Sequence, residues 1–83
     1  MPNPRRDANP AALRALGRSV KKIREEAGMT QTVLAEEVGM TRGSIANIER
    51  GSQNTTVATL IAIAMACETT LDHMVDQAAG MWR

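Results

Sequence analysis

The chain has 83 residues, of which 43% are hydrophobic and 23% charged, with a formal net charge of +1 and only one Cys and one His. This composition suits a folded domain rather than a long disordered chain, and one Cys with one His cannot complete a structural zinc site. The longest apolar run is too short to span a bilayer and the N-terminal stretch MPNPRRDANP is not apolar, so we expect no membrane contact and a cytoplasmic location.

The first expected helix begins after a proline-rich segment. Residues 1–10 contain all three prolines and are typical of an extended or disordered arm. Trp82 is the only aromatic residue, so an aliphatic core is required. From Ala11 the pattern predicts a helix that ends at Gly28, a residue suited to a left-handed C-terminal stop. Its apolar residues recur every three or four positions: Leu13, Leu16, Val20, Ile23 and Ala27.

Two short helices are expected next. Thr30 is suited to cap the first of them, which ends at Gly39, and Thr41 is suited to cap the second, which ends before Gly51. Their apolar residues again have helical spacing: Val33, Leu34 and Val38 in one, Ile45 and Ile48 in the other. Helices of about two turns are unstable alone in water, so these two must pack across each other and onto the first helix.

The second half of the chain predicts two more helices. The polar stretch SQNTT leads to a fourth helix, capped by Thr55 or Thr56, whose body VATLIAIAMAC is apolar nearly all round. Thr70 is suited to cap a short fifth helix. The sequence therefore predicts an all-α fold, a compact five-helix domain over residues 11–78, with a C-terminal tail over 79–83.

The break between the second and third helices turns a polar face outward. The third helix shows on that face Arg42, Gly43, Ala46, Asn47 and Arg50. An Arg can bond guanine O6 and N7 as a fork, and an Asn can pair with adenine N6 and N7. A short helix, braced across a glycine turn by a helix with the small Ala35, can project into a DNA major groove. This arrangement is a helix-turn-helix, and it predicts DNA binding.

Longer motifs point the same way. They are IREEAGMTQTVLAEEVG, MTRGSIANIERG, TLIAIAMAC and TTLDHMV, and the agreeing positions include Gln31, Leu34, Ala35, Gly39, Ile45, Ile48, Glu49 and Gly51. Through these motifs, from roughly Leu16 to Val75, the sequence resembles the lambdoid phage repressor and Cro-like helix-turn-helix family, often called the Xre family. The resemblance implies a lambda-repressor-like domain with double-stranded DNA as its partner.

The resemblance also implies residue roles. Gln31 matches a phosphate-contacting position at the start of the second helix. Positions of the recognition helix that reach bases or backbone are matched by Thr41, Arg42, Gly43, Ser44 and Asn47. The phosphate-contacting segment that follows is matched by Arg50, Ser52, Gln53 and Asn54. A partly buried ion pair that ties the first helix to the recognition helix is matched by Arg24 and Glu49.

Two features depart from the family pattern. Gly43 has no side chain where the family often places a base-reading polar residue, so either the backbone approaches DNA closely there or one base goes unread. The linker SQNTT lacks basic residues. Contacts with DNA phosphates would therefore come from Arg50, the N-terminal arm and neutral donors. We therefore expect modest affinity at physiological salt.

Basic residues are concentrated in the first part of the chain. Residues 1–50 hold nine Lys and Arg against six Asp and Glu, whereas residues 51–83 hold one against three. Four basic residues form a stripe on the first helix: Arg14, Arg18, Lys21 and Lys22. The sequence leaves two interpretations of this stripe open with equal weight, a surface that faces phosphate and a solvated surface.

Enzymatic chemistry has little support. Asp72, His73 and Asp76 follow Cys67 in the sequence, but no glycine-rich loop or paired nucleophile accompanies them. We interpret Cys67 as a buried, inert thiol, because it lies in an apolar helical run. The sequence predicts no enzyme, no metal site and no cofactor.

The fourth helix has more apolar surface than one core needs. A second apolar stripe comprises Ala58, Ile61, Ala62 and Met65. Such a stripe on a small domain suggests a partner, and we predict a two-fold homodimer through the fourth and fifth helices with Met81 and Trp82. The alternative is that the C-terminal tail folds back over the stripe.

These features predict a sequence-specific, homodimeric DNA-binding transcriptional regulator, acting as a repressor or autoregulatory controller on a near-palindromic operator. Its action would be promoter occlusion or the recruitment of RNA polymerase. The alternative is an antitoxin or adaptor whose main role is to bind another protein.

Overall fold

The structure is a computed structural model that describes residues 9–82. Its five helices are α1 (Pro10–Glu26), α2 (Gln31–Val38), α3 (Arg42–Arg50), α4 (Val57–Ala66) and α5 (Leu71–Trp82). The described part of the chain contains no strand. The predicted all-α five-helix fold is confirmed.

The helix boundaries follow the predicted capping residues. Side-chain oxygens of Thr30, Thr41 and Thr56 each accept a hydrogen bond from a backbone N–H in the first turn of α2, α3 and α4. Gly39 and Gly51 end α2 and α3 with φ of 70° and 72°, a left-handed conformation that glycine adopts without steric cost. The break between α2 and α3 is therefore encoded by Gly39, which ends α2, and by Thr41, which caps α3.

The first helix differs in detail from the prediction. It begins at Pro10, one residue earlier than expected, because Asn9 Oδ1 accepts a hydrogen bond from Ala11 N at 2.9 Å and a proline suits the first position of a helix. The remainder of the predicted arm, residues 1–8, lies outside the described residues. Ala27, the last residue of the predicted apolar face, follows the end of α1 at Glu26 and is exposed.

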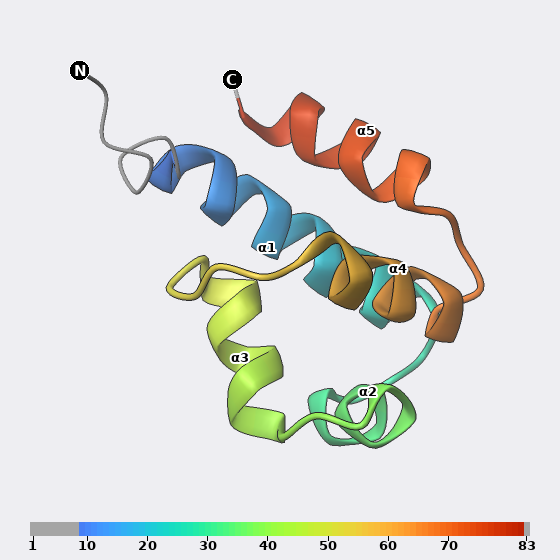
Figure 1. Cartoon of the computed structure of the whole chain (residues 1–83). Coiled ribbons are helices and arrows are strands. Elements are labelled where there is room, and N and C mark those ends of the chain that lie inside the picture. The colour runs from blue at the N-terminus through green and yellow to red at the C-terminus, as the bar shows by residue number, and fades with distance from the viewer. Residues whose placement is uncertain (1–8, 83) are drawn as a thin grey trace.

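The fifth helix is longer than predicted. Residues 79–82 continue α5, so the expected separate tail is wrong for these positions. In Figure 1, α5 runs alongside α1 in the opposite direction. The buried Ser19 Oγ donates to the Met74 carbonyl oxygen at 2.7 Å, and Arg18 Nη2 donates to that of Met81 at 3.3 Å. These bonds hold α5 against α1 up to Met81.

A single core joins the five helices. Each helix contributes a large, fully buried apolar side chain: Val20 from α1, Leu34 from α2, Ile45 from α3, Ile63 from α4 and Met74 from α5. Burying an aliphatic side chain of this size stabilises a fold by about 1.5–3 kcal/mol. The shared core therefore supplies the stability that α2 and α3 lack as isolated helices.

The most apolar helix is α4, whose ten residues include no charged side chain. Within residues 9–82 no single helix is long and apolar enough to cross a membrane. Only α4 and α5 taken together reach that length and composition, and the two are bent by 104°.

Candidate nucleic-acid interface

The helix α3 presents its polar face at one end of the molecule. In Figure 1, α2 and α3 lie together at the end opposite α5. Ile45 and Ile48 are buried on the inner side of α3, whereas Arg42, Gly43 and Arg50 are exposed on its outer side. The outer side of α3 carries two cationic side chains and no exposed carboxylate.

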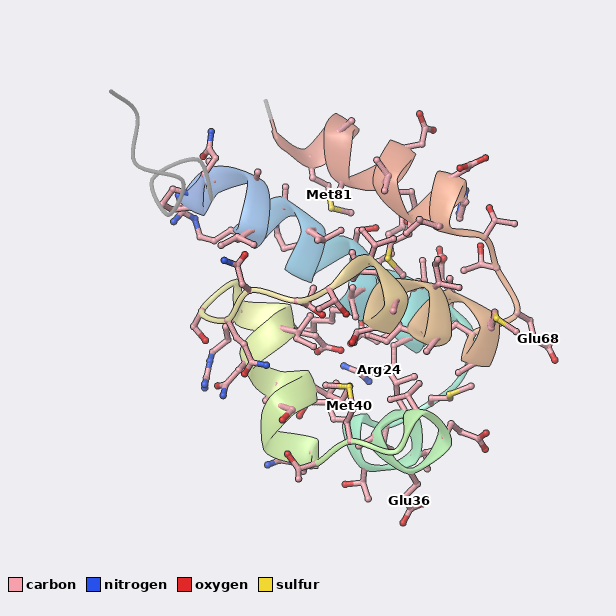
Figure 2. The ribbon with its side chains drawn as sticks, in the orientation of Figure 1. Arg24, Glu36, Met40, Glu68 and Met81 are labelled. Atoms are coloured by element: carbon pink, nitrogen blue, oxygen red, sulfur yellow. The ribbon has the colours of Figure 1, made fainter. Side chains whose placement is uncertain are left out.

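A buried ion pair fixes α3 to α1. Arg24 Nε lies 2.6 Å from Glu49 Oε2, and Arg24 Nη2 donates to Glu49 Oε1 at 3.1 Å. Arg24 Nη1 also donates to the Met29 carbonyl oxygen at 2.7 Å, just before α2. The hydrogen bond to Glu49 raises the pKa of Arg24 against the opposing effect of burial. Figure 2 shows the Arg24 side chain in the region between α2 and α3. The pair that the resemblance implies is thus present, with exposed fractions of 7% for Arg24 and 8% for Glu49.

Gln31 is joined to this pair. Its Nε2 donates to Glu49 Oε1 at 3.0 Å, so it gives the carboxylate a third hydrogen bond. As the first residue of α2, Gln31 has a backbone N–H without an intrahelical acceptor. The bond to Glu49 leaves this N–H and the second amide hydrogen for another partner. The phosphate contact predicted for Gln31 stays a prediction.

Two glycines bring backbone against backbone between α1 and the end of α3. A Cβ on Gly17 would lie 2.4 Å from the Ile48 carbonyl oxygen and 2.5 Å from that of Glu49. A Cβ on Gly51 would lie 2.7 Å from Arg14 Cα. Gly17 is not among the residues predicted from the sequence, although a glycine inside an amphipathic helix often signals such a close approach.

The other predicted residues of α3 are linked to one another. The Thr41 hydroxyl accepts from Ser44 N at 3.0 Å and donates to Ser44 Oγ at 2.9 Å. Arg50 Nη2 donates to Asn47 Oδ1. Ser52 Oγ donates to the Asn47 carbonyl oxygen at 3.2 Å. Arg50 and Asn47 therefore orient each other, and Asn47 keeps its amide hydrogens for a further acceptor.

Gln53 and Asn54 follow α3 and lie beside the start of α4. With four further residues they border a surface hollow of about 460 Å³: Met40, Thr55, Thr56 and Thr59. Gln53 is half-buried and Asn54 exposed. Their phosphate contacts stay predictions.

Gly43 has two possible roles: a close approach of its backbone to DNA, or a position that leaves one base unread. A substitution can separate the two. A Cβ there would meet only Thr41 Oγ1, at 3.9 Å, so nothing in the protein requires a glycine. We expect Gly43→Ala to raise the free energy of unfolding by about 0.5–1 kcal/mol in urea titrations, because alanine is the better helix former. Lower stability would contradict this.

The same variant tests the approach to DNA. If the backbone at Gly43 touches DNA, Gly43→Ala weakens binding tenfold or more despite its higher stability. Unchanged binding would show that this position leaves a base unread.

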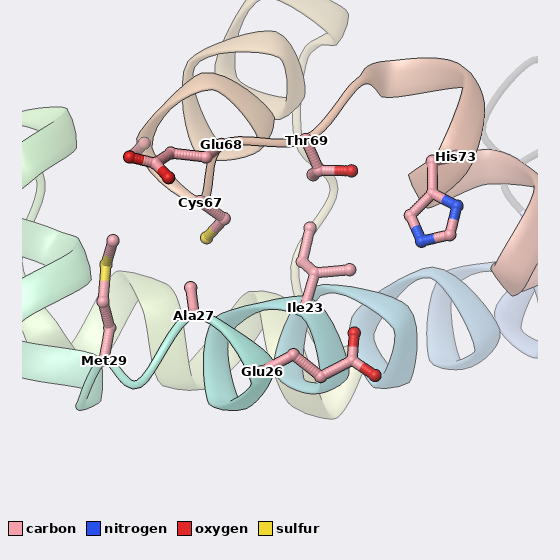
Figure 3. A pocket seen from close by; sticks show the side chains of 9 residues that line it. Ile23, Glu26, Ala27, Met29, Cys67, Glu68, Thr69 and His73 are labelled. Carbon is pink, nitrogen blue, oxygen red and sulfur yellow. The ribbon is translucent and has the colours of Figure 1, made fainter.

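A separate hollow of about 350 Å³ lies between the end of α1 and the turn before α5. Figure 3 shows Cys67 and His73 on its lining, toward opposite ends of the view, with Ile23 and Thr69 between them. Burial raises the pKa of the Cys67 thiol, which suits the predicted inert thiol. Among the residues from 9 to 82, no group of three or more His, Cys, Asp or Glu could hold a metal ion.

One protein-family model matches most of the chain. The HTH_3 model, described as helix-turn-helix, matches residues 20–74. This segment runs from the middle of α1 to the first part of α5, and it includes the whole of α2 and α3. More than half of the chain is therefore covered by one family model.

Two characterised proteins are similar in sequence. The immunity repressor protein of Bacillus phage phi105 is 41% identical over 51 residues, 61% of this chain and 35% of that protein. Antitoxin HipB of Escherichia coli K12 is 32% identical over 56 residues, 68% of this chain and 64% of HipB. The chain thus spans about a third of the phage repressor and just under two thirds of HipB.

Solved structures share the fold. The clp gene regulator ClgR from Corynebacterium glutamicum matches with a TM-score of 0.84 at 25% identity, over 87% of this chain and 92% of ClgR. The wild-type restriction-modification controller protein C.Esp1396I matches with a TM-score of 0.76 at 33% identity, over 84% of this chain and 92% of the controller. These matches confirm the predicted resemblance. The chain belongs to the HTH_3 helix-turn-helix family of DNA-binding regulators.

Proposed function

We propose that this chain is a sequence-specific transcriptional regulator that binds a near-palindromic operator as a homodimer. The observation that carries the proposal is the exposed polar face of α3, held to α1 by the buried Arg24 and Glu49 pair. A recognition helix must keep a fixed orientation if its side chains are to reach base edges. The proposed action is promoter occlusion or contact with RNA polymerase in the cytoplasm.

On this proposal α3 lies in the major groove. Arg42 is exposed in its first turn and is suited to guanine, and Asn47 is suited to adenine. Contacts to phosphate would flank them, from the backbone N–H of Gln31 and from Arg50. The remaining phosphate donors proposed are neutral: Thr41, Ser44, Ser52, Gln53 and Asn54.

Replacing the two proposed base readers tests this assignment. Each contact is worth about 1–3 kcal/mol, so the double variant Arg42→Ala and Asn47→Ala should lose at least about 30-fold in operator affinity. Arg18→Ala, which removes one charge from the α5 side of α1, is the control and should bind within a few-fold of the wild type. Equal affinity of the double variant and this control would contradict the assignment. Binding is measured by fluorescence anisotropy with labelled duplex.

The proposed homodimer rests on the exposed apolar surface of α4 and α5. Ile61 and Met65 are 41% and 71% exposed, and Ala58 beside them is exposed. A second apolar feature is a groove of about 220 Å³ between α1, α4 and α5. Its lining residues are all apolar: Ala12, Leu16, Leu60, Val75, Ala78 and Ala79. On this proposal a second copy would cover both the stripe and the groove, and Met81 in α5 is half-buried.

A charge placed on the stripe tests the dimer. Ile61→Glu should give a particle of 9.0 kDa by light scattering, whereas the wild type gives twice that mass, because an uncompensated carboxylate in an apolar interface is strongly unfavourable. Val33→Glu is a matched control, since Val33 is also 41% exposed but lies on α2. A wild type that stays monomeric at high concentration would contradict the homodimer.

The similarity to HipB favours a second candidate, an antitoxin whose apolar surface binds another protein. The variants above separate the two functions. Loss of DNA binding by the Arg42 and Asn47 double variant with an intact protein complex supports a regulator that also has a partner. Loss of that complex through the same two changes would favour the adaptor.

A further inference from the structure

The basic stripe on α1 has two sides. Positions 14, 17, 21 and 24 follow one another in steps of three and four, so they line one edge of the helix. Three of the four contact the C-terminal part of α3 or the glycine after it. Arg14 lies against Gly51, Gly17 lies against Ile48 and Glu49, and Arg24 bonds Glu49. The fourth position, Lys21, therefore lies on the edge of α1 that adjoins α3.

The other two basic residues lie toward α5. Arg18 Nη2 donates to the Met81 carbonyl oxygen in α5, and Ser19 Oγ donates to that of Met74. Lys22 is one turn after these two residues and on the same side of α1. Lys21 and Lys22 are thus neighbours of equal charge, both exposed, that project from different sides of one helix.

Lys21 is the last of three cationic side chains that follow one another from the end of α3 along one edge of α1. Arg50 ends α3, and Arg14 follows across Gly51, since a Cβ on that glycine would lie 2.9 Å from Arg14 Cγ. Lys21 is the next cation along the same edge of α1. Within the described residues the ion pair that forms is that of Arg24 and Glu49, and the Lys21 ammonium has no carboxylate within 4.0 Å.

We propose that Lys21 binds a DNA backbone phosphate beside the recognition helix, with Arg14 next to it on the same edge. The inference rests on the proposed function, which places α3 in the major groove. Phosphates border that groove on both sides, and a lysine has a long stem with three rotatable donors at its end. Gln31, the first residue of α2, bonds the same Glu49 carboxylate as Arg24. The edge of α1 that carries Lys21 therefore leads to the N-terminus of α2.

The test compares Lys21→Gln with Lys22→Gln on a labelled duplex of mixed sequence at several salt concentrations. A phosphate contact contributes about 0.9 to the slope of log affinity against log salt, which corresponds to about eightfold at ~0.1 M salt. We expect Lys21→Gln to lose this amount of slope and affinity per protomer. Lys22→Gln should keep both within twofold, and Lys21→Arg should restore most of the loss. The melting temperatures of all three variants should equal that of the wild type.

The outcomes separate this inference from the proposed function. If the wild type binds the duplex but Lys21→Gln and Lys22→Gln lose the same affinity and slope, the Lys21 contact is wrong and the proposed function stands. Equal retention by both variants has the same meaning. If the wild type does not bind any duplex even at low salt, both proposals fall.

Discussion

Replacing Glu49 by alanine should lower the free energy of unfolding by about 3–5 kcal/mol. The carboxylate accepts two hydrogen bonds from Arg24 and one from Gln31. Its removal leaves the Arg24 guanidinium buried without a counter-charge, since only 7% of that residue is exposed. The loss is comparable with the whole stability of many small domains, so Glu49→Ala should be largely unfolded at 37 °C. Urea titration followed by circular dichroism measures it.

The matched control removes both charges. Arg24→Met with Glu49→Leu should recover most of the stability, because apolar residues can replace a buried ion pair at little cost or with a gain. The same double variant should bind DNA less well than the wild type, because the bond from Gln31 and the fixed contact between α1 and α3 are lost. A loss below 1 kcal/mol for Glu49→Ala would show that the pair contributes little to the fold.

Replacing Gly17 by alanine should lower the free energy of unfolding by about 1–3 kcal/mol, the usual range for an overpacked core. The added methyl group would meet the Ile48 and Glu49 carbonyl oxygens at 2.4 and 2.5 Å. Both are backbone atoms, so they cannot move aside as a flexible side chain can. Either α1 and α3 separate or the end of α3 shifts, and the second response should also weaken DNA binding. Thermal unfolding and duplex binding on the same variant measure both effects.

Gly80 provides the control for this substitution. It lies in α5, and no heavy atom within 4 Å would meet a Cβ at that position. Gly80→Ala should therefore gain about 0.5–1 kcal/mol, the ordinary benefit of alanine in a helix. If Gly17→Ala gains as much as Gly80→Ala, the backbone contact between α1 and α3 is not tight.

The parts of the fold that depend on local chemistry were predictable. Thr30, Thr41 and Thr56 cap helices, and Gly39 and Gly51 end them, because capping depends on a few adjacent residues. The apolar spacing also located the inner side of α3. The extent of α5 was not predictable in this way, since its C-terminal turns are held by contacts with α1 that are distant in sequence.

The candidate site was predictable in its residues but not in its contacts. The family pattern supplied Arg24, Gln31 and Glu49, yet the bond from Gln31 to Glu49 appears only when α1, α2 and α3 meet. The close packing at Gly17 is likewise a property of two helices, and its sequence signal was one glycine. Which basic residues of α1 lie toward α3 and which lie toward α5 could be decided only from the positions of those two helices around α1. Tertiary contacts therefore supplied what spacing could not.

The most direct test of sequence-specific DNA binding starts from a pool of random duplexes. The purified chain selects from this pool, and its affinity is then measured for the enriched duplex and for a scrambled one. A specific regulator should prefer the enriched duplex by a factor of about 10³ or more, and the duplex should contain two half-sites about 34 Å apart. The Arg42→Ala and Asn47→Ala variant should lose this preference. No enrichment, or equal affinity for both duplexes, would contradict the account.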